Sequence, residues 1–446
     1  MNQADTGTPA AEDVRSAGPV RIARVGRALS LLPVLMAVEY RVRMDWGSFT
    51  LVELSTILVW LLVACCPPQV AGRKVFRSLL PLLLMLMTAG FFSVFQDSDA
   101  KHAASVYRDF VLPVVFLLGF LLLPLGHEQV LFLIKLFILG AAACSILALV
   151  QFATDAGMWT ANEQQEAWQE FKAGMIRETF WGRLLGVGHT LPVGLSSATN
   201  NLASFLIFPA AAVLPLCSDR VPVCEGRRVW RLSFCLMTAA LVVSCSRGPL
   251  LTVIAAALCF RWLSRAGRVT AGKLVSCALM TGAAATALLW TGLLSWDALG
   301  TGEGRLEMAG DAVDLIRSRP AMLMAGGVTG EYQETYHRDQ VVHNSLLYII
   351  LQFGLPALIL SAWIVLSQVR QMLRGIGDSD SAVSRVGLAV LCGVTVNLLL
   401  FMQTTSFFDS VQASFILYFW IGLGVHLCRP QGSFRAPDDF GVPHVI

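Results

Sequence analysis

The stretch VLFLIKLFILGAAACSILALV, residues 130–150, decides the fold class of this chain. Its one charged residue is Lys135, and its length is close to the ~20 residues that a helix needs to cross a bilayer. Because backbone polar groups find no water in hydrocarbon, such a run must hydrogen-bond internally as a helix. The stretch therefore predicts a transmembrane helix.

The rest of the chain has the composition of a polytopic membrane protein. Of 446 residues, 55% are hydrophobic and 14% are charged, and the mean hydropathy is +0.64, whereas soluble domains carry about 25% charged residues. The apolar residues gather in runs, so we expect an all-α integral membrane protein with about 12 transmembrane helices. The runs cover residues 28–40, 50–66, 78–95, 109–126, 129–153, 199–217, 230–246, 248–264, 273–295, 342–368, 384–405 and 411–428.

The basic residues predict the orientation of these helices. Arginines precede the first run and recur in four connections that all fall on the same side as the N-terminus, so both termini are expected in the cytoplasm. No cleavable signal peptide is visible in the polar N-terminal tail. The expected organisation comprises cytoplasmic tails (1–27 and 429–446), three groups of membrane helices (28–153, 199–295 and 342–428) and two large outer loops (154–198 and 296–341).

Both outer loops carry an excess of acidic residues and a helix signal. In the first, a capping box from Thr160 to Glu163 precedes Trp168, Phe171 and Met175 at helical spacing. In the second loop, the spacing of the apolar residues predicts a helix with one apolar face, and Pro320 ends that helix. The residues of that face are Leu306, Ala309, Val313 and Ile316. Each helix either lies on the membrane surface or packs on the helical bundle.

Two polar positions at the outer ends of apolar runs are candidates for chemistry. Arg247 stands between helix-breaking residues, where an arginine is costly unless it is paired, solvated or functional. His343 begins the tenth run and is followed by Asn344; a histidine can act as a base near neutral pH. The alternatives are an arginine that snorkels to the interface and a histidine that caps a helix.

Other candidates are weaker when each is taken alone. Arg183 precedes the sixth run and Arg305 opens the helix of the second loop, and either could be a surface charge. The glycine-rich turn 326–330 is a weak signal for phosphate binding. The Asp-Ser-Asp pairs at 97–99 and 378–380 are common in loops and give little support for a metal site. No soluble basic domain is present, so no nucleic-acid partner is expected.

Taken in order, these segments resemble the O-antigen ligase and O-antigen polymerase superfamily of bacterial envelope glycosyltransferases. The resemblance covers about residues 180–365, whereas residues 1–170 match in hydropathy only. The matching elements are Arg183-Leu-Leu-Gly186, Asn200-Asn201-Leu-Ala, Ser246-Arg247-Gly248, Arg305, Arg319-Pro320, Gly326-Gly327, and His343-Asn344-Ser345-Leu-Leu with Gly354.

The resemblance implies a GT-C-like, inverting, metal-independent transferase in the bacterial inner membrane, with its active site at the periplasmic face and no cofactor. Its donor would be an undecaprenyl-diphosphate-linked glycan. Its acceptor would be lipid A–core for a ligase, or a second lipid-linked glycan for an O-antigen or exopolysaccharide polymerase. Catalytic roles fall on His343 and Arg247. Substrate-binding roles fall on Arg183, Arg305, Asn344 and Asn200.

The chemistry of these residue types agrees with that expectation. An arginine fork matches phosphate oxygens and can stabilise a diphosphate leaving group without metal. Three other functions remain open: a transporter for a lipid-linked glycan, a protein O-glycosylating transferase, and a metal-dependent enzyme that uses Asp97 and Asp99. Flipping activity in liposomes would favour the first, and loss of activity in EDTA the last.

Overall fold

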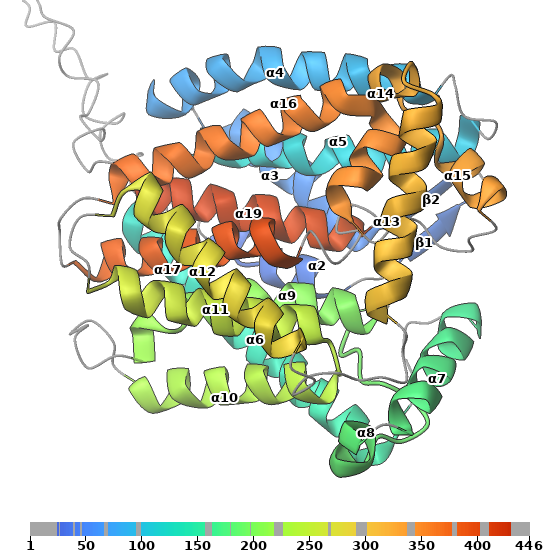
Figure 1. The fold of residues 1–446 in the computed structure, drawn as a ribbon. Coiled ribbons are helices and arrows are strands. Elements are labelled where there is room, and N and C mark those ends of the chain that lie inside the picture. The colour runs from blue at the N-terminus through green and yellow to red at the C-terminus, as the bar shows by residue number, and fades with distance from the viewer. Residues whose placement is uncertain are drawn as a thin grey trace, which may run out of the picture.

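A computed structural model gives the fold, which is helical apart from one hairpin (Figure 1). The structure describes residues 25, 27–38, 41–44, 47–66, 70–94, 100–156, 163–178, 180–196, 198–217, 226–265, 269–290, 301–336, 344–376, 381–401 and 410–429.

The N-terminal third contains the first helices and a small antiparallel sheet in which Arg41 pairs with Thr50 and Met44 with Gly47. The sequence did not predict this hairpin, because residues 41–50 read as a polar connection between two apolar runs. The elements are α2 (Leu32–Ala37), β1 (Arg41–Met44), β2 (Gly47–Thr50), η1 (Leu51–Glu53), α3 (Leu54–Cys65), α4 (Val70–Val94), α5 (Ala100–Leu122) and α6 (His127–Thr154).

The middle third contains the first outer loop and four further helices of the bundle. Its elements are α7 (Glu163–Arg177), α8 (Phe180–Leu185), α9 (Thr199–Ala212), η2 (Pro215–Cys217), α10 (Arg227–Val243), α11 (Arg247–Leu263) and α12 (Ala271–Trp290).

The C-terminal third begins with the second outer loop and ends in the most buried helix. Its elements are α13 (Thr301–Ser318), α14 (Met322–Ala325), α15 (Thr329–Thr335), α16 (Ser345–Gly375), α17 (Ala382–Val396), the π-helical turn η4 (Asn397–Phe401) and α19 (Val411–Leu427).

Helices form at every one of the predicted apolar runs, so the helical fold class is confirmed. Among the described residues, four helices are long and apolar enough to cross a membrane by length and composition, which suggests a multi-pass membrane protein. These are Ala104–Leu122, His127–Thr154, Ser345–Gly375 and Ala382–Leu399. Several shorter apolar helices lie beside them, such as Gly248–Leu263 and Val411–Leu427.

Helix α19 forms the centre of the bundle. Every residue from Val411 to Leu427 is buried, as expected for a helix that is apolar on all sides. Its aromatic side chains join a cluster in which the Phe137 and Phe419 rings stack at 5.3 Å. The Phe208 and Trp420 rings stack at 6.1 Å in the same cluster. Contacts with α5, α6, α9, α16 and α17 cover the helix.

Large apolar side chains also cover the outside of the bundle. Trp363 and Leu366 on α16 are 63% and 62% exposed, and Met280 on α12 is 69% exposed. Soluble monomers rarely expose large contiguous apolar patches. An apolar exterior of this kind is what a lipid environment would cover.

The helices predicted within residues 154–198 and 296–341 form, and the structure shows which of their side chains are buried. In α13 Ala312 and Leu315 are buried, and Ile316 of the predicted apolar face is partly buried against the same core. In α7, Ala173 and Ile176 are buried, whereas Phe171 is 57% exposed. Both helices are amphipathic, so more than one apolar stripe was available, and tertiary packing selected between them.

Candidate functional site

The break between α10 and α11 positions the first candidate residue. Cys245 adopts a left-handed conformation with φ of 55°, which is uncommon for a residue other than glycine. Ser246 then takes the N-cap position and Arg247 is the first residue of α11. The two apolar runs are therefore separate helices, and the backbone of Arg247 lies at a helix N-terminus.

Asn200 and the Ser246-Arg247 segment meet in the fold although 46 positions separate Asn200 from Ser246 in the chain. The Ser246 hydroxyl donates to Oδ1 of Asn200 at 3.4 Å. Asn200 lies in the first turn of α9, which packs against α11. Two segments that the sequence analysis singled out are therefore in contact.

Lys172 on α7 contacts the same region. Its ammonium group donates to the hydroxyl of Thr199 at 2.9 Å, and Thr199 is fully buried at the start of α9. Sequence reasoning missed Lys172, because a single lysine in an acidic outer loop reads as a solvated surface charge. We call Lys172, Thr199, Asn200 and Ser246 the polar chain.

The polar chain lies where two helices begin. Neither the N-cap of α9 nor that of α11 makes a side-chain capping hydrogen bond. Helix N-termini present unpaired backbone N–H groups and partial positive charge, which favour anions. The backbone of Arg247 lies in this first turn of α11, and its side chain is outside the described atoms.

Residues at the end of α6 hold the segment that leads into the site. The Gln151 side chain accepts from the backbone N–H of Val193 at 3.1 Å and of Gly194 at 2.8 Å. Its amide group also donates to the carbonyl of Gly194 at 3.1 Å. Because Gln151 is buried and saturates both backbone groups of Gly194, it fixes the approach to α9.

Asp155, which follows Gln151 by about one helical turn, forms hydrogen bonds to the same segment. Its carboxylate accepts from the backbone N–H of His189 at 2.9 Å and of Thr190 at 3.0 Å. The hydrogen bond from His189, followed by that from Thr190, lowers the pKa of Asp155 below its usual value. Asp155 is also the left-handed C-cap of α6, so it ends that helix and anchors the following loop.

Apolar packing supports the polar chain from one side. Ala173, next to Lys172, is fully buried with Ile176 in a small core. Val187, Leu191 and Cys245 complete that core, which joins α7 to the α10–α11 turn. The position of Lys172 therefore depends on packing as well as on its hydrogen bond.

The glycine-rich turn of the second outer loop serves a packing role. Gly354 breaks α16 with φ of 82°, and a side chain on Gly326 would lie 2.5 Å from its backbone nitrogen. Gly327 and Val328 donate to the carbonyls of Gln352 and Leu351, both at 3.0 Å. The glycines thus allow two backbones to meet, which explains the turn without a phosphate.

Asn344 is the N-cap of α16. Its side-chain oxygen accepts from the backbone N–H of Leu346 at 3.0 Å and of Leu347 at 3.1 Å. The predicted catalytic residue His343 lies outside the described residues and immediately precedes Asn344 in sequence. The amide oxygen of Asn344 thus has a structural use.

Arg183 and Arg305 are the remaining arginines that the sequence predicted for the site. Arg183 is exposed on α8, next to Gly182, which packs against the Ile176 carbonyl. No contact joins Arg183 to the polar chain in the described part of the structure. Arg305 lies in α13, and its side chain is outside the described atoms.

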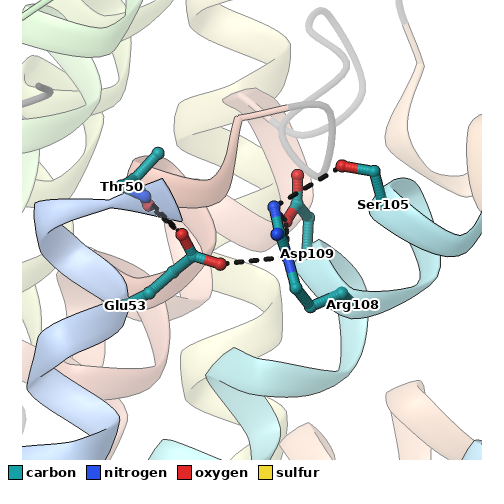
Figure 2. Close-up of polar contacts among 5 residues, drawn as sticks. All are labelled: Thr50, Glu53, Ser105, Arg108 and Asp109. Atoms are coloured by element: carbon teal, nitrogen blue, oxygen red, sulfur yellow. Dashed lines mark hydrogen bonds and ion pairs between the residues drawn. The ribbon is translucent and has the colours of Figure 1, made fainter. Parts of the chain in front are cut away.

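An ionic cluster near the hairpin is a second polar site that the sequence did not indicate. Figure 2 shows Arg108 between Glu53 and Asp109. Its Nε lies 3.0 Å from Glu53, and an Nη lies 2.8 Å from Asp109. The Glu53 side chain is fully buried, and the N–H and hydroxyl of Thr50 donate to its other oxygen. The cluster joins the start of α3 to α5.

Within the described residues no group of three His, Cys, Asp or Glu side chains could hold a metal ion. Both Asp-Ser-Asp pairs, at 97–99 and 378–380, lie outside those residues.

Comparison with known proteins adds no family. No protein-family model matches the chain, and no curated protein is significantly similar to it in sequence.

Proposed function

We propose that this chain is a multi-pass membrane glycosyltransferase that takes a glycan from undecaprenyl diphosphate, as an O-antigen ligase acting on lipid A–core or as a related surface-polysaccharide ligase. The observation that carries the proposal is the contact between Asn200 and Ser246. This contact joins the Asn200 segment to the Ser246-Arg247 segment, and Lys172 contacts the neighbouring Thr199.

The proposal includes twelve membrane helices with both termini in the cytoplasm. Several of the helices are shorter than a full span, and tilt, bilayer thinning or burial within the bundle would accommodate them. In this topology the polar chain, Asn344 and the ionic cluster all lie at the outer end of the bundle. The diphosphate headgroup of a lipid donor in the outer leaflet would lie at the same level.

The proposed reaction needs one leaving-group site and one base. The acceptor hydroxyl oxygen attacks C1 of the donor sugar and forms the new glycosidic bond. The bond between C1 and the diphosphate oxygen breaks, and the configuration at C1 inverts. The acceptor proton passes to His343. The undecaprenyl diphosphate departs with negative charge that Arg247 stabilises, because an arginine fork matches phosphate oxygens.

The other candidate residues take supporting roles in this proposal. Arg183 and Arg305 bind the donor from the two outer loops, and Asn200 orients the α11 N-terminus through Ser246. Asn344 caps the helix that follows His343 and in this way positions the base. No metal or cofactor is required.

The test supplies purified full-length protein with undecaprenyl-diphosphate-linked oligosaccharide in EDTA, with and without lipid A–core. Glycan on lipid A–core would identify a ligase. A ladder of longer lipid-linked chains without that acceptor would identify a polymerase. Flipping of intact donor in liposomes, without transfer, would replace the proposal with a transporter.

Two variants test the assigned residues within the same assay. His343→Ala and Arg247→Ala should both abolish most transfer. Arg317→Ala is the matched control, because that side chain is 76% exposed on α13. Full transfer by His343→Ala would remove the proposed base.

A further inference from the structure

We propose that Lys135 and Arg228 bind the phosphate headgroup of an anionic phospholipid, at the edge that α6 and α10 share on the outside of the bundle. This inference goes beyond glycosyl transfer and needs only that the bundle lies in a membrane. It depends on three observations: the level of the two residues along their helices, the exposed faces that carry them and the local charge.

The packing of α6 on α10 sets the level of the two residues. Near the end of α6, Phe152 packs against the small core that contains Cys245, which lies just beyond the end of α10. The two helices therefore run in the same direction with their C-terminal ends together. Lys135 precedes Phe152 by 17 residues, and Arg228 precedes Cys245 by 17 residues. Because both helices rise about 1.5 Å per residue, Lys135 and Arg228 lie at one level of the bundle.

Both residues lie on faces that the protein itself leaves uncovered. On α6, Phe132 and Leu139 are 51% and 43% exposed, and Lys135 lies between them at helical spacing, with its side chain partly exposed. On α10, Arg228 is exposed, and Leu232, one turn later on the same face, is 60% exposed. The two cations therefore lie within the apolar exterior that a lipid environment would cover.

The charge of this edge is basic. The first two turns of α10 carry Arg227, Arg228 and Arg231 and no acidic residue. Glu128 in the first turn of α6 is seven residues before Lys135, which corresponds to about 10 Å along the helix. Neither Lys135 nor Arg228 forms a hydrogen bond or an ion pair within the part of the chain that the structure describes. Their charges are therefore available to an external anion.

An anionic phospholipid is the ligand that suits two cations in an apolar surface. Its phosphate oxygens accept from the ammonium and guanidinium groups, while its acyl chains lie along the exposed side chains of α6 and α10. In the proposed topology this level is that of the cytoplasmic headgroups, where clustered basic residues attract anionic lipids. The alternative is that each side chain only extends to water, without preference for any headgroup.

The experiment measures binding of phosphatidylglycerol and of phosphatidylcholine to the detergent-solubilised full chain by native mass spectrometry. Variants are Lys135→Met, Arg228→Met, their combination and Lys135→Arg. Arg265→Met is the matched control, because this exposed arginine lies at the same end of the bundle, after α11. Thermal midpoints are recorded beside the dissociation constants, and inorganic phosphate is added as a competitor.

We expect each single methionine variant to weaken phosphatidylglycerol binding about fivefold, and the double variant about 25-fold, from the contribution of one basic residue near an anionic surface. Lys135→Arg should bind like the wild type because it keeps the charge, and Arg265→Met should also bind normally. Wild-type affinity in the double variant, or equal wild-type affinity for phosphatidylcholine, would overturn the assignment. An equal loss in Arg265→Met would overturn it too, since the attraction would then be spread over the whole basic end.

The competitor separates a lipid site from a site for free anions. Phosphatidylglycerol that stays bound in excess inorganic phosphate would support a lipid site, whereas displacement at equal concentration would overturn it. The result does not depend on glycosyl transfer. Charge-dependent lipid binding by a protein without transfer activity would support this inference and count against the transferase. Transfer by the wild type, with unaffected lipid binding in the double variant, would do the reverse.

Discussion

The ionic cluster and the polar chain both place a basic side chain between helices, yet they surround it differently. Arg108 lies between two carboxylates, so its charge is more than balanced inside the protein. Lys172 bonds a neutral hydroxyl beside a segment that carries Arg247. The first arrangement holds α3 against α5, and the second holds α7 against the start of α9. The two basic side chains therefore join different helices through partners of different charge.

The largest effect should come from Arg247→Ala, which tests the proposed catalytic role of the residue that follows the polar chain. Transfer should fall about 10²- to 10³-fold, the usual loss when one stabilising group for transition-state charge is removed. The thermal midpoint should stay close to that of the wild type. Initial rates and thermal melts on the same preparations check both. A parallel collapse of stability and activity would make Arg247 a structural residue.

Arg108→Met tests the structural side. It leaves the carboxylate of Glu53 buried without its cation, which should cost about 3 kcal/mol of stability because an uncompensated buried charge remains. Unfolding in a denaturing detergent series measures the loss, and transfer per folded molecule should not change. Glu53→Gln combined with Arg108→Met should recover much of the loss. A double variant no more stable than Arg108→Met would contradict the ion-pair account.

Asn344 provides an intermediate case, because it is both a motif residue and a helix cap. Asn344→Ala should cost about 1 kcal/mol of stability through loss of the bonds to Leu346 and Leu347. Asn344→Ser should restore stability and transfer together, since serine is also a good cap. Restored stability with lost transfer would move Asn344 to the group of substrate-binding residues.

The smallest effect concerns pH and the loop that Asp155 anchors. Because hydrogen bonds lower the pKa of Asp155 in the folded protein, its stabilising contribution is present above the ordinary pKa of about 4 and is lost as pH falls through the folded-state value. Asp155→Asn should lower the thermal midpoint at pH 7. The gap from the wild type should shrink below pH 4. A gap that stayed constant would show that ionisation of Asp155 does not stabilise the fold.

The candidate site was predictable only in part, for reasons that its residues illustrate. Arg247 stood out because an arginine between apolar runs is costly, and Asn200 because its segment resembles a family motif. Lys172 has no such mark, and only the return of α7 onto α9 places it beside Thr199. Arg108 and Glu53 lie at the ends of separate runs, so nothing local indicated that they pair.

By itself the sequence determined where the helices are, because the length and hydropathy of each apolar run are local properties that require internal hydrogen bonding. Only the tertiary structure decided which face of α13 is buried. It also decided that the backbones at Gly326 and Gly354 lie in close contact, and that Arg108 pairs with Glu53 and Asp109. Those outcomes depend on contacts between segments far apart in the chain. The sequence pattern of one segment does not show which distant segment packs against it.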